Sequence, residues 1–315
     1  MKTSKELSEK LRLINSDKSY LSFNTTGQIL ETEFPPDRWV VDELIPEYSI
    51  TAISGIPGSF KTWITEEVAR CISSGEKLFG KFNTNYGPVM FIDKENHLKH
   101  IQKRLVQVGF IKSHDVLYIK EDNFLIDKDD DFNKLLKTVK KLEPILVVFD
   151  PLVRIHSGNE NESKDISKIM GRFRQITNQG ASVLFVHHHR KENSNYKKSA
   201  NSLRGSSDIF AGIDCLLMVE KKDDSLIIEQ AKLRQQQAIE PFTVKIQSNK
   251  ETGEIKFTYE GEHNPGKTAI EDTKKEIVLL FREEETEEMS RQEIIDILSD
   301  DYSSGTIDKA LKELV

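Results

Sequence analysis

The chain has 315 residues, enough for one large α/β domain with a smaller appendage. Apolar residues make up 37% of it and charged residues 31%, which indicates a core beneath a well-solvated surface. The net charge of −7 argues against a protein that coats nucleic acid non-specifically, because such proteins are usually basic. No apolar run approaches the ~20 residues of a membrane helix, and no secretory signal is visible. With two cysteines that lack metal-ligand spacing, these features predict a cytoplasmic protein.

Residues 1–38 are polar and predict an N-terminal arm with one short helix, Lys5 to Ile14. Beyond Trp39, short apolar runs alternate with amphipathic stretches that repeat every three or four residues. Strands are expected over 48–53, 89–93, 116–119, 145–150 and 182–186, and helices over 61–73, 98–108, 132–142 and 166–176. This alternation predicts an α/β fold with a central, mainly parallel sheet.

The pattern changes after residue 212, where helical periodicity stops. Adjacent strands are expected over 215–219, 226–231, 242–246 and 255–259, which predicts an antiparallel extension of the sheet. Residues 262–267 have the composition of a linker. Three short helices then follow, the second of which opens with the capping box Ser290 to Glu293. The predicted domains are an arm (1–38), an ATPase domain (39–262) and a helical domain similar to a winged helix without its wing (268–315).

A glycine-containing segment follows the first of these strands and opens a helix, which is the context of a phosphate-binding P-loop. It consists of Gly55, Ile56, Pro57, Gly58, Ser59, Phe60, Lys61 and Thr62. The glycines allow backbone N–H groups to point at phosphate oxygens, and Lys61 adds a positive charge. Thr62 offers a hydroxyl to Mg²⁺, so the segment predicts binding of ATP with Mg²⁺. Phe60 replaces the usual glycine, and the alternative is an unrelated Gly/Pro turn.

Acidic residues end two other predicted strands. Asp150 closes the most apolar run of the chain, and a carboxylate there belongs at the ligand-binding edge of the sheet. It is the candidate for the Walker B aspartate that orients Mg²⁺. Glu95 follows the strand 89–93 and is the candidate general base for the attacking water, with Asp93 as its competitor.

Three consecutive histidines, His187, His188 and His189, end the strand that begins at Ser182. Consecutive strand residues alternate between faces, so the three side chains cannot converge on one metal ion. We expect His188 or His187 to be a polar sensor of the γ-phosphate.

Five motifs in this order resemble the RepA-like ATPases of plasmids and phages, in the RecA/DnaB superfamily that includes hexameric replicative helicases. They are Gly-x-x-Gly-Ser-Phe-Lys-Thr, Phe-Ile-Asp-Lys-Glu-Asn, Val-Val-Phe-Asp-Pro-Leu, Val-His-His-His-Arg-Lys and Leu-Arg-Gly-Ser-Ser-Asp-Ile. The similarity covers about residues 39–246, and the phenylalanine before the lysine is itself a variant of this group.

The resemblance implies a RecA-like P-loop core and a ring, usually of six subunits, with ATP between neighbours. By position, Lys61 and Thr62 would bind the triphosphate and Mg²⁺, Glu95 would be the catalytic glutamate, Asp150 the Walker B residue and His188 the sensor.

A Lys-x-Arg element follows a predicted strand at Lys232 and Arg234. It matches the element with which DnaB-type helicases reach the neighbouring subunit's γ-phosphate, which would make Arg234 the arginine finger. Arg204 is the rival candidate, and a plain exposed strand is the simpler alternative.

Two loops at the expected ligand edge bear on nucleic acid. Residues 155–164 follow Asp150 and are polar, and the loop 190–204 is basic. In the family the corresponding loops touch single-stranded DNA, since cations track phosphates and aromatic rings stack on bases. The alternative is an ordinary charged surface loop. The candidate DNA-binding residues are Arg190, Lys191, Tyr196, Lys197, Lys198 and Arg204.

The first functional hypothesis is a hexameric replicative-type helicase that moves on single-stranded DNA, from a plasmid, phage or other mobile element. The second is a RecA-type ATPase that does not unwind DNA, such as a recombination mediator, a loader or a regulatory ATPase. A small-molecule kinase is a third and weaker hypothesis, because no acceptor-binding motif supports it.

Overall fold

The computed structural model describes residues 10–14, 19–21, 24–33, 36–188, 207–283, 289–299 and 301–314. The chain divides into two compact units, residues 1–37 and 38–315. In the first unit, residues 10–14 are helical, at the end of the predicted helix. A second helix, α2 (Thr26–Glu31), was not predicted, although Thr25 and Gln28 form a capping box at its start.

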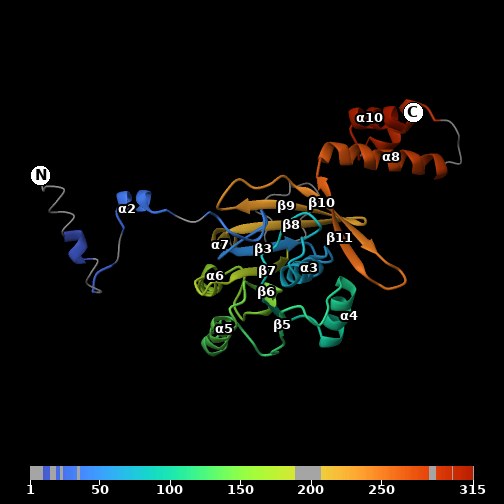
Figure 1. The fold of residues 1–315 in the computed structure, drawn as a ribbon. Coiled ribbons are helices and arrows are strands. Elements are labelled where there is room, and N and C mark those ends of the chain that lie inside the picture. The colour runs from blue at the N-terminus through green and yellow to red at the C-terminus, as the bar shows by residue number, and fades with distance from the viewer. Residues whose placement is uncertain are drawn as a thin grey trace, which may run out of the picture. The chain divides into compact units, whose positions relative to one another are not determined.

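The second unit is built on a nine-stranded sheet with the order β11-β10-β9-β8-β3-β7-β6-β4-β5 (Figure 1). Strands β3 to β8 pair parallel with one another, and β9 to β11 extend the sheet antiparallel from β8. The predicted antiparallel extension is confirmed from β9 onward, but its first predicted strand, 215–219, lies in β8 and is parallel to β3. The strands are β3 (Ile50–Gly55), β4 (Val89–Asp93), β5 (Val116–Ile119), β6 (Leu146–Asp150), β7 (Ser182–His188), β8 (Cys215–Lys222), β9 (Ser225–Leu233), β10 (Phe242–Ser248) and β11 (Ile255–Glu262).

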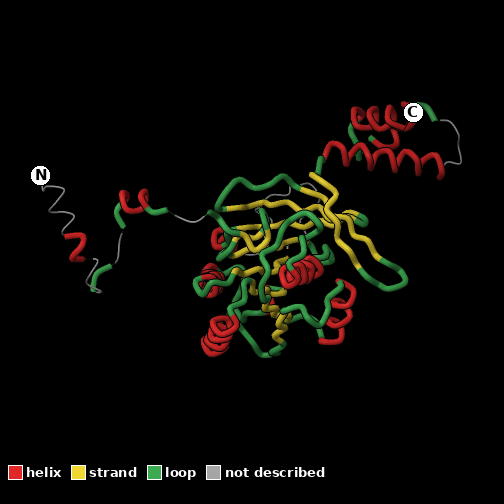
Figure 2. Tube along the Cα trace, in the orientation of Figure 1, coloured by secondary structure: helices red, strands yellow, loops and turns green. Residues whose placement is uncertain are grey.

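Helices flank the sheet on both faces (Figure 2). Side chains on successive strand residues enter two separate cores, since a strand points alternate residues to opposite faces. In β6, Val148 packs with the helix α3 core, whereas Val147 and Phe149 pack with α5 and α6. The helices of this unit are α3 (Lys61–Ser74), α4 (Leu98–Val108), α5 (Asp129–Leu142), α6 (Ser163–Thr177) and α7 (Ser207–Gly212).

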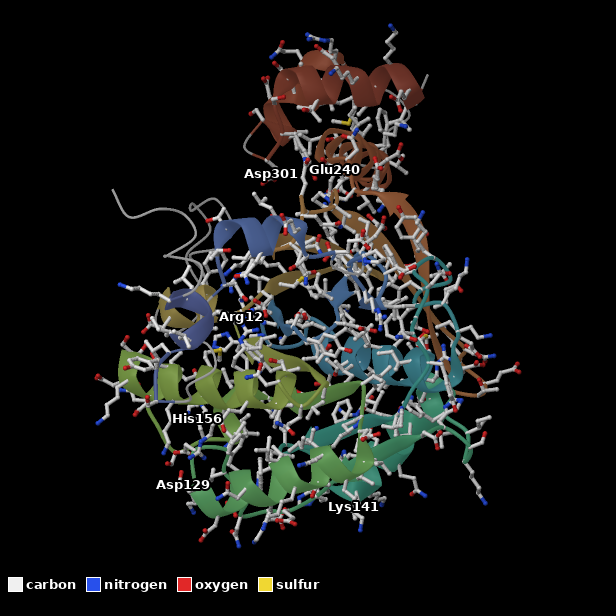
Figure 3. All side chains as sticks on the ribbon, turned by 60° about the vertical axis from the view of Figure 1, so that its left-hand side comes forward. Arg12, Asp129, Lys141, His156, Glu240 and Asp301 are labelled. Atoms are coloured by element: carbon white, nitrogen blue, oxygen red, sulfur yellow. The ribbon has the colours of Figure 1, made fainter. Side chains whose placement is uncertain are left out.

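Charged contacts join the helices on the α5 and α6 face. Asp129, labelled in Figure 3 at the start of α5, pairs with Arg172 of α6. The guanidinium of Arg172 also lies 4.9 Å from the ring centroid of Phe132. These contacts hold α5 and α6 against each other.

Three helices follow the sheet and share a small apolar core of their own. They are α8 (Pro265–Glu283), α9 (Arg291–Leu298) and α10 (Ser304–Leu314). The capping box is confirmed, since the Ser290 side chain accepts from the Glu293 N–H and the Ser290 N–H donates to the Glu293 carboxylate at 2.7 Å. Among the described residues, no helix is long and apolar enough to cross a membrane.

One expectation needs correction, and two short features of this unit were not predicted. The linker predicted over 262–267 is wrong, because β11 continues to Glu262 and α8 begins at Pro265. Proline suits the first position of a helix, where its missing N–H has no partner to lose. Helix α7 was missed because it has only six residues. A small two-stranded sheet, β1 (Trp39–Val41) with β2 (Ile45–Pro46), was also missed because such short strands carry no periodicity.

Candidate nucleotide-binding site

The topology brings the predicted motifs to one edge of the sheet. Gly55 and His188 are register partners at the carboxyl ends of β3 and β7, and Asp93 and Asp150 are register partners at the ends of β4 and β6. Because these strands are parallel, their carboxyl ends share an edge, which is where parallel α/β sheets bind ligands. Lys61, Thr62, Asp150, Glu95 and His188 therefore come from segments that meet there.

The loop from Gly55 to Phe60 takes backbone conformations that few residues allow. A Cβ atom on Gly55 would lie 2.4 Å from the Val219 carbonyl oxygen, so the close approach of β8 requires glycine. Gly58 has a φ of +82°, in the left-handed region that glycine adopts freely. Phe60 is the residue before α3 and has a φ of +65°, a costly conformation for a bulky side chain. The chain therefore turns sharply into the amino terminus of α3.

Lys61 lies under this loop with 5% of its surface exposed. Its Nζ donates to the carbonyl oxygens of Gly55 at 2.9 Å and Ile56 at 2.7 Å, and to the Ser59 hydroxyl at 3.3 Å. Burial lowers the pKa of Lys61 to about 8, while the charges of Asp150 and Glu95 oppose the shift. The ammonium is thus held at the inner side of the loop, where an anion would meet it.

Asp150 is 1% exposed and lies beside the start of α3. Burial raises the pKa of Asp150 to about 7, against the effect of a hydrogen bond with the Thr62 side chain. Its Oδ2 atom is buried with no hydrogen-bond partner among the described residues. An unpartnered carboxylate oxygen next to a threonine hydroxyl is a donor set that fits Mg²⁺, which prefers oxygen ligands.

Asp93 and Glu95 differ in what their carboxylates do. Asp93 is fully buried and accepts from the N–H groups of Glu95 at 2.9 Å and Asn96 at 2.8 Å. Arg104 of α4 reaches its other oxygen at 3.2 Å. Asp93 therefore holds the loop after β4 in place, whereas the Glu95 side chain at the same edge of the sheet is exposed.

A largely buried guanidinium that contacts two carboxyl groups lies behind the site and was not among the predicted residues. Arg104 contacts Glu66 at 3.2 Å as well as Asp93, so it joins α3 to the end of β4. Burial of Glu66 raises its pKa to about 8 although Arg104 opposes this. Glu66 lies one helical turn after Thr62, between the polar residues Thr65 and Glu67, so no local pattern distinguished it from an ordinary surface glutamate.

The histidines lie in different environments. His187 is buried, and its Nε2 is 3.7 Å from Oε1 of Glu160. His156 approaches the same oxygen at 3.8 Å; Figure 3 labels it on the segment after β6. His188 is half-buried at the register position of Gly55, and His189 lies outside the described residues. Within the described part of the chain, no three His, Cys, Asp or Glu side chains are grouped as a metal site.

Lys232 and Arg234 lie at the opposite edge of the sheet. Strand β9 is antiparallel to β8, and Cys215 of β8 pairs with both Leu233 and Thr51 of β3. The end of β9 is therefore beside the start of β3, whereas the P-loop follows the other end of that strand. Neither side chain can serve the P-loop of its own chain.

Both side chains contact the end of α7. Arg234 donates to the Ala211 carbonyl at 2.9 Å and pairs with Asp214 at 3.2 Å, with 53% of its side chain exposed. The Nζ of Lys232 donates to the Phe210 carbonyl and lies 4.6 Å from the centroid of that ring. Burial lowers the pKa of Lys232. Cations at a helix carboxyl end are favoured by the helix dipole, which keeps this pair ordered.

The two candidate DNA loops differ in how far the structure describes them. In 155–164, the N–H of Ser157 donates to Asp127 at 3.2 Å and that of Asn159 to Asp165 at 2.8 Å, so hydrogen bonds tie down this polar segment. The six predicted DNA-binding residues lie outside the described residues, namely Arg190, Lys191, Tyr196, Lys197, Lys198 and Arg204. Arg204 as rival finger is untested for the same reason.

Comparisons with known proteins bear on this site. Residues 16–194 match the family model AAA_25, described as "AAA domain". One solved structure, titled as the ATPase domain of another protein, has a TM-score of 0.53 at 14% identity over 68% of this chain and 86% of its own. A second solved structure is titled "The Structure Of A DnaB-Like Replicative Helicase And Its Interactions With Primase". Its TM-score is 0.56 at 13% sequence identity, and the alignment covers 80% of this chain and 70% of the helicase chain. No curated protein sequence matches.

Proposed function

This chain belongs to the AAA_25 family of AAA domains and has a RecA-type ATPase fold, and we propose that it is a ring-forming helicase that uses ATP to move on single-stranded DNA. The observation that carries the proposal is the separation of Lys61 from Lys232 and Arg234. Lys61 and Arg234 can contact the same nucleotide only if they come from two copies of the chain. The P-loop edge of one copy would then face the end of β9 in the next copy.

Each residue at the P-loop edge has a distinct part in this proposal. Backbone N–H groups of the loop and the Lys61 ammonium bind the phosphates, and Thr62 and Asp150 hold Mg²⁺. The metal ion, when bound, neutralises charge on the phosphate oxygens. Glu95 accepts the proton of the attacking water, and His188 hydrogen-bonds the γ-phosphate. Arg234 of the neighbouring copy stabilises the charge that develops in the transition state.

Contacts around α7 suggest how ATP and DNA are linked. Lys232 and Arg234 hold the carbonyl groups of Phe210 and Ala211, and α7 directly follows the basic segment 190–206. A shift of the two cations toward a neighbour's nucleotide would change what holds α7. We therefore place single-stranded DNA at the segment 190–204, inside a ring that is usually of six subunits in this superfamily.

The test is ATP hydrolysis and strand separation by the assembled protein. Single-stranded DNA is expected to stimulate ATPase activity, and Lys61→Ala is expected to remove it. A forked duplex is expected to be unwound only with ATP and Mg²⁺. A ring that hydrolyses ATP and binds DNA without separating any fork would remove the helicase part of the proposal.

Two observations favour a second candidate, an ATPase that remodels or loads a partner without unwinding DNA. The net charge of −7 is unusual for a protein that encircles DNA, and the helices α8 to α10 form a unit that could bind another protein. Crosslinking decides between the two, because only the helicase requires residues 190–204 to contact DNA inside a closed ring.

A further inference from the structure

Two aromatic rings and a lysine gather at the phosphate-binding loop. The ring centroids of Phe60 and Trp63 are 6.1 Å apart with planes at 31°, and the Nζ of Lys221 lies 5.3 Å from the Phe60 centroid. Both rings are half-buried against the core beneath α3, and Lys221 is exposed. None of the three side chains has a part in the phosphate chemistry proposed above.

The backbone of Phe60 has an energetically unfavourable conformation. With φ of +65° and ψ of +17° it is in the left-handed region, which glycine adopts without strain and a bulky residue does not. Replacing glycine by phenylalanine here is unfavourable for the loop alone. The aromatic side chain must therefore contribute something that offsets the strain, and its contacts with Trp63 and Lys221 indicate where.

The order of the strands shows on which side of the loop this cluster lies. Asp150, Glu95 and His188 come from β6, β4 and β7, all to one side of β3. Lys221 comes from β8, on the other side of β3. The γ-phosphate belongs beside Asp150 and Glu95, and the loop holds the inner phosphates. The nucleoside must then leave the loop on the β8 side, where Lys221 contacts Phe60, which in turn contacts Trp63.

We propose that Trp63, supported by its contact with Phe60, is the surface on which the base of the bound nucleotide stacks, and that Lys221 holds the Phe60 ring in place. This inference rests on the proposed nucleotide site at Lys61 and adds the group that recognises the base. Aromatic side chains stack on any base, and the larger ring system of a purine offers more contact area. The site is thus expected to prefer purine nucleotides over pyrimidine nucleotides.

Tryptophan fluorescence tests the contact directly, because Trp39 and Trp63 are the two tryptophans of the chain. In Trp39→Phe, Trp63 is the only remaining tryptophan, and its emission is selected by excitation at the red edge of the absorption band. Saturating ADP is expected to quench its emission, whereas inorganic tripolyphosphate, which has no base, is expected to bind without comparable quenching. Emission that ADP leaves unchanged, or that tripolyphosphate quenches equally, would overturn the proposal.

Binding affinities supply the second measurement. Trp63→Ala is expected to weaken ADP binding by about 10-fold, in line with the loss of one base–aromatic stack, and Trp63→Phe by much less. Calorimetry with CDP and with tripolyphosphate provides the controls, because Trp63→Ala should weaken the binding of these two ligands less than the binding of ADP. If Trp63→Ala binds ADP as the parent does, the stacking inference is wrong although the nucleotide site stands. If the parent does not bind tripolyphosphate or ADP, the proposed function itself is wrong.

Discussion

Lys61 and Arg234 belong to opposite ends of one sheet. Lys61 begins the helix after β3, whereas the Arg234 N–H donates to the Asp214 carbonyl at 2.9 Å, and the Asp214 N–H donates to Ile50 at the start of β3. Strand β3 has six residues, which separates the two ends by roughly 17–20 Å. If Arg234 is the arginine finger proposed above, it would act on the nucleotide of a neighbouring copy, and each site would be shared between two chains.

Glu95→Gln is expected to lower the ATP turnover rate by about 100-fold or more while ATP binding stays close to the parent's, because only the general base is lost. Steady-state hydrolysis and a nucleotide-binding titration measure the two effects. Unchanged turnover would show that another group accepts the proton.

Asp93→Asn is the matched control at the same strand end. Since Asp93 is buried and paired with Arg104, this change is expected to reduce the free energy of unfolding by about 3–5 kcal/mol. Urea denaturation measures it. A stable Asp93→Asn protein without turnover would instead favour Asp93 as the base.

Asp150→Asn is expected to stabilise the metal-free protein at pH 8. The folded-state pKa of about 7 lies above the ordinary value of 3.8, so the folded chain binds this proton more tightly than the unfolded chain. The resulting stability is complete below the ordinary value and is lost as the pH rises through about 7. Asparagine does not ionise, so the variant does not lose this stability as the pH rises. Its free energy of unfolding should exceed that of the parent by about 2–4 kcal/mol at pH 8 and by little near pH 4.

Thermal melts at the two pH values, without Mg²⁺, test this difference. The same variant should lose Mg²⁺-dependent hydrolysis. Mg²⁺ should stabilise the parent more at pH 8 than at pH 6, because the ion competes with the proton for Asp150. A variant that is less stable than the parent at pH 8 would contradict the assignment.

Glu66→Gln is expected to be nearly neutral at pH 7, because burial raises the pKa of Glu66 to about 8 and the carboxyl is largely protonated there. The stability that the parent derives from this proton is lost above pH 8. The free energy of unfolding of the variant should therefore exceed that of the parent at pH 9. Arg104→Met should cost about 3–5 kcal/mol, since it leaves Asp93 buried without its cation. Urea titrations of both variants at pH 7 and pH 9 measure these effects, and equal losses at pH 7 would argue that Glu66 is ionised.

The core strands were predictable because unbroken apolar runs such as 146–149 bury both faces of a parallel sheet. The acid at the end of such a strand, Asp150, was predictable because burial of an unpaired carboxylate is costly. The contacts of Lys232 with Phe210 in α7 could not be predicted, because they join segments that are far apart in sequence. Helix α7 itself could not be predicted either, because it carries no local pattern. The contact between Arg104 and Glu66 also depends on tertiary packing, which a single sequence does not encode in readable form.

The shared site is tested most directly by mixing two inactive variants. Lys61→Ala lacks the lysine and Arg234→Ala lacks the finger, and each alone is expected to have almost no ATPase activity. When the two are assembled together in equal amounts, about a quarter of the interfaces combine an intact P-loop with an intact finger, so a corresponding share of activity should return. A mixture that stays as inactive as its components, in assemblies shown to contain both chains, would contradict the account.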